Sequence, residues 1–309
     1  MKKYLLFAVL LCAVTHISTA QERTDTIGMK VVTLSDVVVR SDINVRSFMQ
    51  KVQDDSSFHK AFKNLRILAH TTTHDIRMLD KDGNIAASFT GKTVQHRRDN
   101  CRTMETVDEK VSGDFYDADR SYNYYTAKMY ASLFFTVGKI CGEDNIVGNE
   151  ELTTEGKSGI EKSKEQLKML FFNPGRKIEG IPFLSEKTEL YGDKLAAYYD
   201  MDIDIDFYNG YNCYIFTQKV KPGNEDKVVI DEMVTWFNKE NMEVVARTYK
   251  LKYNAMVYDF DVEMEVKMGS YNGLTVPVLV KYNGDWKVVG KKRERGLFTA
   301  VINDFKTVD

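Results

Sequence analysis

Three histidines offer the clearest route to chemistry in this sequence. His70 and His74 lie four residues apart in an extended stretch, which places both on one face of a strand. If the Asp82-Gly83 turn sets the register of a hairpin, His96 falls diagonally near His70. Three imidazoles with an open fourth position can hold a catalytic zinc ion. The spacing lacks the specificity of known zinc motifs, so the pattern favours a solvated strand face beside Thr72.

An enzyme built on these histidines is therefore the least favoured function, and we expect neither catalysis nor a bound metal or cofactor. The chain contains no Gly-x-Ser-x-Gly elbow, phosphate-binding glycine loop or dinucleotide fingerprint. Four aspartates alternate with apolar residues between Asp200 and Asp206, but a calcium loop also needs a central glycine and a bidentate glutamate. Their alternation predicts the solvent-facing side of a strand.

The first twenty residues have the form of an export signal. Lys2 and Lys3 precede an apolar run over residues 4–14, and a small-x-small site predicts cleavage after Ala20. A lipidated Cys12 is the alternative, although the leucine before it stands where a small residue is needed. No other segment reaches the roughly 18 apolar residues of a transmembrane helix. We therefore expect an exported protein of the periplasm or the outer-membrane periphery.

The overall composition excludes two classes of protein. With 43% hydrophobic residues, 17 Phe and 17 Tyr, the chain has enough core material to exclude a disordered protein. Its net charge of −2 supplies no basic surface, so nucleic acid is not an expected partner. Three cysteines remain after the signal. Cys213 lies in a strand pattern, whereas Cys101 and Cys141 lie in polar surroundings and are the candidate disulfide, which export permits.

The apolar periodicity divides the rest of the chain. Residues 21–42 form an N-terminal lead, and residues 43–309 a single α+β domain. An amphipathic helix is expected over 43–65, with a break near Asp54 to Ser57, and a hairpin from strands 66–79 and 84–98. Residues 99–193 are expected as a helical or irregular insertion. It contains an aromatic-rich stretch, 122–139, of either helix or strand type, and a helix over 158–172.

After Lys194 the pattern has period two, which predicts consecutive antiparallel strands. The longest, 256–268, exceeds the usual five or six residues and favours a large curved sheet. We expect hairpin turns at 238–241 and 283–285. The expected strands are 211–220, 228–237, 244–253, 256–268, 274–282 and 297–305. The predicted fold is a long curved antiparallel meander, a half-barrel whose concave face is covered by the amphipathic helices.

Methionine and aromatic side chains share the apolar face of this meander. Such soft side chains suit an adaptable binding surface, and they also suit an ordinary core. The candidate ligand-binding residues are Tyr249, Tyr253, Met256, Tyr258, Phe260 and Met264.

Several segments carry a resemblance to known proteins. The stretches 208–216, 236–244 and 282–286, together with 101–104 and 123–130, resemble an uncharacterised family of exported Bacteroides-type proteins, which implies no activity. The order of elements is similar to the LolA/LolB lipoprotein-carrier fold, without a shared residue motif. That second resemblance implies a half-closed antiparallel barrel whose helix-covered apolar face holds acyl chains.

We therefore expect an exported cell-envelope binding protein that holds a lipid, an acyl chain or another apolar ligand in the concavity of the sheet. The alternative is a non-enzymatic envelope scaffold, or protein-interaction module, whose core is filled by its own helices and whose partner is another envelope protein.

Overall fold

The computed structural model describes residues 45–147, 169–178, 184–254 and 258–307. All of them belong to one compact unit. The predicted signal peptide and N-terminal lead, Met256 and most of the expected 158–172 helix lie outside the described residues. Of that helix, residues 169–172 are described and are helical.

Within the described residues, eleven strands form one antiparallel sheet in the order β4-β3-β2-β1-β11-β10-β9-β8-β7-β6-β5. Their bounds are β1 Ala69–Leu79, β2 Ile85–Arg98, β3 Cys101–Ser112, β4 Ile140–Cys141, β5 Tyr199–Tyr208, β6 Tyr211–Val220, β7 Ile230–Asn238, β8 Val244–Asn254, β9 Tyr258–Tyr271, β10 Leu274–Val288 and β11 Glu294–Lys306. β4 and β5 end this order and do not pair, so the sheet is open. The predicted α+β fold with a long antiparallel meander is confirmed.

The insertion expected at 99–193 is wrong in its first part. Residues 101–112 form β3, which pairs with β2 along most of its length, so they belong to the sheet. Most β3 side chains are exposed to solvent, which accounts for the polar composition of this strand. The aromatic-rich stretch after it forms helix α3, Tyr125–Phe134.

The turn expected at 283–285 is also wrong, because β10 continues through it to Val288. Gly284 lies inside the strand, where a Cβ atom would stand 2.0 Å from the Tyr282 hydroxyl oxygen. The glycine therefore makes room for the Tyr282 ring, whose hydroxyl accepts a hydrogen bond from Trp286 Nε1. Turn-forming residue types do not distinguish a turn from this close approach.

The helix expected at 43–65 is present as two helices, with the predicted break between them. The helices are α1 Val45–Asp54, α2 Ser57–Ile67, α3 Tyr125–Phe134 and α5 Asp193–Ala196, with short 3₁₀ turns η1 Ser185–Lys187 and η2 Glu225–Lys227. Asp55 produces the break, because its carboxylate accepts hydrogen bonds from the backbone N–H and the Oγ of Ser57, each at 3.1 Å. Satisfying those donors begins a new helix at Ser57.

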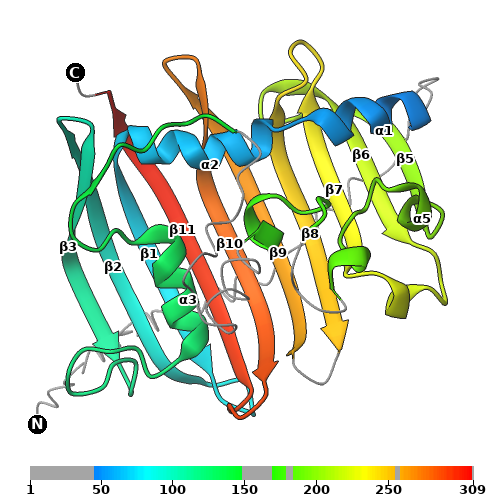
Figure 1. Cartoon of the computed structure of the whole chain (residues 1–309). Helices are drawn as coiled ribbons and strands as arrows, with labels where there is room; N and C mark the ends of the chain where they lie inside the picture. The colour runs from blue at the N-terminus through cyan, green and yellow to red at the C-terminus, as the bar shows by residue number, and fades with distance from the viewer. Residues whose placement is uncertain (1–44, 148–168, 179–183, 255–257, 308–309) are drawn as a thin grey trace, which may run out of the picture. The chain divides into compact units, whose positions relative to one another are not determined.

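Helices α1, α2 and α3 lie over the same face of the sheet (Figure 1). α1 contacts β5, α2 contacts β10, and α3 contacts β11. The core occupies the space between them and the strands, with Phe58 of α2 and Phe260 of β9 among its fully buried side chains. The opposite face carries ion pairs such as Lys281–Glu265 at 3.1 Å. Among the described residues, no helix is long and apolar enough to span a membrane.

Candidate functional site

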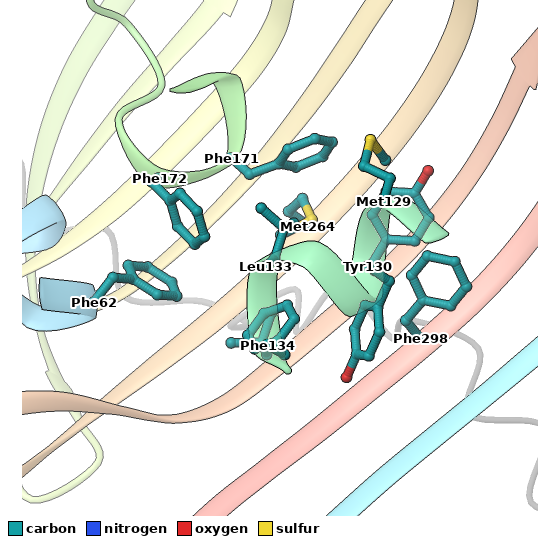
Figure 2. Close-up of a pocket in the computed structure, with 11 residues that line it drawn as sticks. Phe62, Met129, Tyr130, Leu133, Phe134, Phe171, Phe172, Met264 and Phe298 are labelled. Atoms are coloured by element: carbon teal, nitrogen blue, oxygen red, sulfur yellow. The ribbon is translucent and has the colours of Figure 1, made fainter. Parts of the chain in front are cut away.

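An apolar cavity lies where three helical segments meet strands β9, β10 and β11 (Figure 2). Side chains from α2, α3 and residues 171–172 cover it, and side chains from the three strands form its floor. The lining consists of Phe62, Met129, Tyr130, Leu133, Phe134, Phe171, Phe172, Met264, Val280, Tyr282 and Phe298. None of these side chains is charged. The cavity has a volume of about 20 Å³, which is room for about one water molecule.

The structure places the predicted apolar-face residues unequally around this cavity. Met264 lines it directly. Tyr249 pairs with Met264 across the strands, and Tyr253 pairs with Phe260. Tyr249, Tyr253 and Phe260 are buried in the core beside the cavity. Tyr258 begins β9, and Met256 lies outside the described residues. Of the predicted residues whose side chains the structure describes, Met264 is the one that lines the cavity.

The covering side chains were missed by sequence reasoning. Met129, Leu133 and Phe134 come from α3, whose stretch fitted helix and strand equally well. Phe172 ends the expected 158–172 helix, where a run of apolar residues was the available signal. The described part of that segment is tied to the sheet because the Tyr249 hydroxyl donates a hydrogen bond to the Phe171 carbonyl, 2.6 Å away.

The beginning of α3 is attached to strand β11. The Glu294 carboxylate accepts hydrogen bonds from the backbone N–H groups of Tyr125, at 3.1 Å, and Thr126, at 2.9 Å. Tyr124, at the N-cap position, makes no side-chain capping bond. Glu294 therefore satisfies the free donors of this helix end from a distant part of the sequence. Burial raises the pKa of Glu294, while these hydrogen bonds lower it.

The middle of α3 is attached to β1 through a histidine. His74 Nδ1 lies 3.1 Å from the Tyr130 hydroxyl, and its Nε2 lies 2.8 Å from Thr93 Oγ1. Burial lowers the pKa of His74 to about 3, and that of His70, also buried, to about 4. The neutral imidazole of His74 therefore links the covering helix to the sheet as a hydrogen-bonding group.

The three predicted histidines do not form a metal site. β1 pairs with β2 so that Gln95, rather than His96, stands opposite His70. His96 therefore points to the other face, where its Nε2 lies 3.2 Å from Glu105. The solvated-face expectation is also wrong for His70 and His74, which are 6% and 1% exposed. No cluster of three His, Cys, Asp or Glu suited to a metal occurs in the described part of the chain.

Cys101 and Cys141 are joined by a disulfide that links β3 to β4. Arg102, next to Cys101, pairs with Glu143 just beyond Cys141. This bridge closes the segment that carries α3. Cys213 is free and buried, in keeping with its strand pattern.

Comparison with known proteins returns only distant likenesses. No protein-family model matches the chain, and no curated protein matches it significantly. A DUF1329 family protein from Desulfovibrio piger is 10% identical, over 85% of this chain and 90% of that one, with a TM-score of 0.24. A LolA superfamily protein from Nitrosomonas europaea is 7% identical, over 86% and 94%, with a TM-score of 0.24. A putative outer membrane lipoprotein-sorting protein domain from Vibrio parahaemolyticus is 8% identical, over 84% and 90%, with a TM-score of 0.26. Scores this far below 0.5 do not establish a common fold.

Proposed function

We propose that this protein is an exported, non-enzymatic binding protein of the cell envelope that holds a lipid, an acyl chain or another apolar ligand. The ligand lies between strands β9–β11 and the cover formed by α2, α3 and residues 171–172. The observation that carries this proposal is the cavity, which is lined entirely by uncharged and mostly apolar side chains. Binding proceeds by burial of apolar surface, worth about 25 cal/mol per Å².

The cover can move without breaking the sheet. Helix α3 has ten residues, and polar links to Glu294 and His74 hold it to the strands. Met129 and Leu133 on α3 are only partly buried. Displacement of α3 would enlarge the cavity at the cost of these hydrogen bonds and of the burial of Ala127 and Tyr130. Methionine side chains suit such a surface, because they adapt to ligands of different shape.

The proposed location rests on two features. The first twenty residues fit a signal peptide cleaved after Ala20. The Cys101–Cys141 disulfide suits an oxidising compartment such as the periplasm. The proposed partners are accordingly an apolar small molecule or lipid and, at the membrane periphery, another envelope protein.

An envelope scaffold is the second candidate, and one observation favours it. The cavity volume of about 20 Å³ is far smaller than an acyl chain, which supports an interior filled by the protein's own side chains. A scaffold needs no opening of α3 and no ligand. The two functions predict different results on purification, because a lipid should co-purify with a carrier and not with a scaffold.

Native mass spectrometry of protein purified from the periplasm of its host, followed by organic extraction, tests the proposal. The variants are Met264→Asp in the cavity floor, Phe134→Asp in the cover and the control Val301→Asp, which places the same charge at an exposed apolar position of β11. We expect a co-purifying lipid at near-unit stoichiometry in wild type and Val301→Asp. It should be absent from both cavity variants at an unchanged circular dichroism spectrum. Lipid-free wild-type protein at the mass expected from Gln21 contradicts a carrier and favours the scaffold.

A further inference from the structure

A buried arginine lies on the helix-covered face of the sheet, near the cavity. Arg247 of β8 is 4% exposed, on the face covered by the helices. Its Nε donates a hydrogen bond to Thr235 Oγ1 at 2.9 Å, and its guanidinium lies 4.3 Å from the centre of the Phe58 ring. Among the described residues, no carboxylate forms an ion pair with it. Burying a charge without a counter-charge destabilises a fold. A buried, unpaired guanidinium therefore indicates a binding site for an anion.

Other polar groups converge on the same place. The Gln218 side chain is fully buried, and its Nε2 donates to the Tyr191 hydroxyl at 3.2 Å. Within the described part of the chain, Gln218 Oε1 has no hydrogen-bond partner. Arg247 and Arg176 both lie close enough to Tyr191 to lower the pKa of its hydroxyl, against the larger effect of burial. Arg247, Gln218 and Tyr191 are buried and Arg176 is half-buried, and within the described residues this polar cluster carries more positive than negative charge.

The nearby aspartate does not neutralise this cluster. Asp55 interacts with Arg247 electrostatically. Its carboxylate accepts two hydrogen bonds from Ser57, at the beginning of α2. Its backbone carbonyl accepts a hydrogen bond from Arg176 Nη2 at 3.0 Å. One carboxylate therefore stands near two guanidinium groups and is already engaged by the helix end.

Two series of packed side chains connect the polar cluster to the cavity. Phe58, which stacks on Arg247, lies 5.5 Å from Phe62 between ring centres, and Phe62 lines the cavity. Along β8, Arg247 is two residues from Tyr249, which pairs with Met264 of the cavity floor. Two residues of a strand span about 7 Å. Arg247 does not line the cavity itself, because the buried Phe58 and Tyr249 lie between them, so a head reaches Arg247 when the movement that admits the chain also displaces Phe58.

We propose that Arg247 binds the anionic headgroup of an amphiphile whose apolar chain occupies the cavity, so that the ligand is a long-chain carboxylate or phosphate and not a neutral lipid. This inference rests on the proposed function. The planar guanidinium presents paired donors that match the oxygens of a carboxylate or phosphate. Of the Gln218 amide, only the second N–H of Nε2 can donate to such a head, because Oε1 is an acceptor and so is an anion.

Displacement of the neutral fluorescent probe N-phenyl-1-naphthylamine separates the two claims. The competitors are palmitate, its uncharged methyl ester and inorganic phosphate. Each is titrated into the probe complex of delipidated wild type, Arg247→Met and Arg247→Lys, and its dissociation constant is measured. We expect wild type to bind palmitate about tenfold more tightly than methyl palmitate. Arg247→Met should lose that preference and Arg247→Lys should retain part of it, with each preference measured against the probe affinity of the same protein.

Each remaining outcome overturns one claim. Equal binding of palmitate and its methyl ester by wild type overturns the headgroup site and leaves the carrier function in place, and this result needs no variant. A preference that survives in folded Arg247→Met has the same consequence. Displacement by inorganic phosphate at concentrations similar to palmitate points to a free-anion site and contradicts the amphiphile. If the probe does not bind wild type at all, the proposed function fails, and the headgroup site fails with it.

Discussion

The carboxylate of Glu294 accepts two hydrogen bonds from Thr126, one from its backbone N–H at 2.9 Å and one from its Oγ1 at 2.7 Å. The two residues are 168 positions apart in sequence. A negative group at the first turn of a helix satisfies free N–H donors and interacts favourably with the helix dipole. The position of α3 over the cavity is therefore coupled to the first residue of β11.

Removing this carboxylate should loosen the cover. In Glu294→Ala we expect the amides of residues 125–134 to exchange hydrogen roughly tenfold faster, because the lost cap costs about 1–2 kcal/mol. Hydrogen exchange with mass spectrometry measures this effect. Arg295→Ala is the matched control, because Arg295 is exposed and pairs with Asp285. Equal protection of α3 in wild type and Glu294→Ala would contradict the proposed attachment.

The buried histidines should make the fold sensitive to acid. The pKa values of His70 and His74 are about 4 and about 3 in the folded protein, against 6.5 in the unfolded chain. Below pH 6.5 the unfolded state binds more protons, so stability that is fully present above pH 6.5 is lost as the pH falls toward 4. Each histidine should contribute a loss of up to about 2 kcal/mol between pH 6.5 and pH 5.

Urea unfolding across that pH range measures the slope. In His74→Gln we expect about half of the histidine-dependent slope to remain, because His70 still titrates and glutamine can hydrogen-bond to Tyr130 and Thr93. His96→Gln makes the same substitution at a histidine exposed on the other face and is the matched control. A slope that His74→Gln leaves unchanged would show that His74 is not buried in its neutral form.

Gly284 should not tolerate a side chain. A Cβ atom there meets the Tyr282 hydroxyl oxygen at 2.0 Å and ring carbon Cζ at 2.3 Å. We expect Gly284→Ala to lower the free energy of unfolding by about 1–3 kcal/mol, as overpacked sites do. Asn283→Ala, exposed on the same strand, should change it little.

A double-mutant cycle identifies the cause. The penalty of Gly284→Ala should shrink when Tyr282 is already alanine, because the clashing ring is then absent. Additive penalties in this cycle would mean that backbone conformation, not the ring, requires the glycine.

The disulfide should stabilise the segment that carries α3. Cys101 and Cys141 are 40 residues apart, and opening a loop of that length should cost about 2–4 kcal/mol. We expect this loss in the double variant Cys101→Ser/Cys141→Ser, measured by urea unfolding without reductant. A thiol count with Ellman's reagent provides the control. Among the described residues only Cys213 is free, and it is fully buried. In a chain cleaved after Ala20, as proposed, one thiol should therefore react after unfolding and none before.

The sequence by itself determined most of the strands after residue 194, because alternating side chains on a half-covered sheet leave a period-two pattern, but it ended β10 too early, at the expected turn 283–285. It also determined the break between α1 and α2, because Asp55 and Ser57 act within one turn of each other. The order of the meander followed from short connections between successive strands.

Only the tertiary structure decided the composition of the site. A shift of one residue in register moves a side chain to the other face, and this separated His96 from His70. α3 has apolar side chains on most of its surface, so its periodicity did not distinguish helix from strand, and its cap, Glu294, comes from a strand 168 residues away. Arg247 occupies an inward position of β8 that local hydropathy assigns to an apolar residue. These features depend on contacts between distant segments, and local residue patterns carry no record of such contacts.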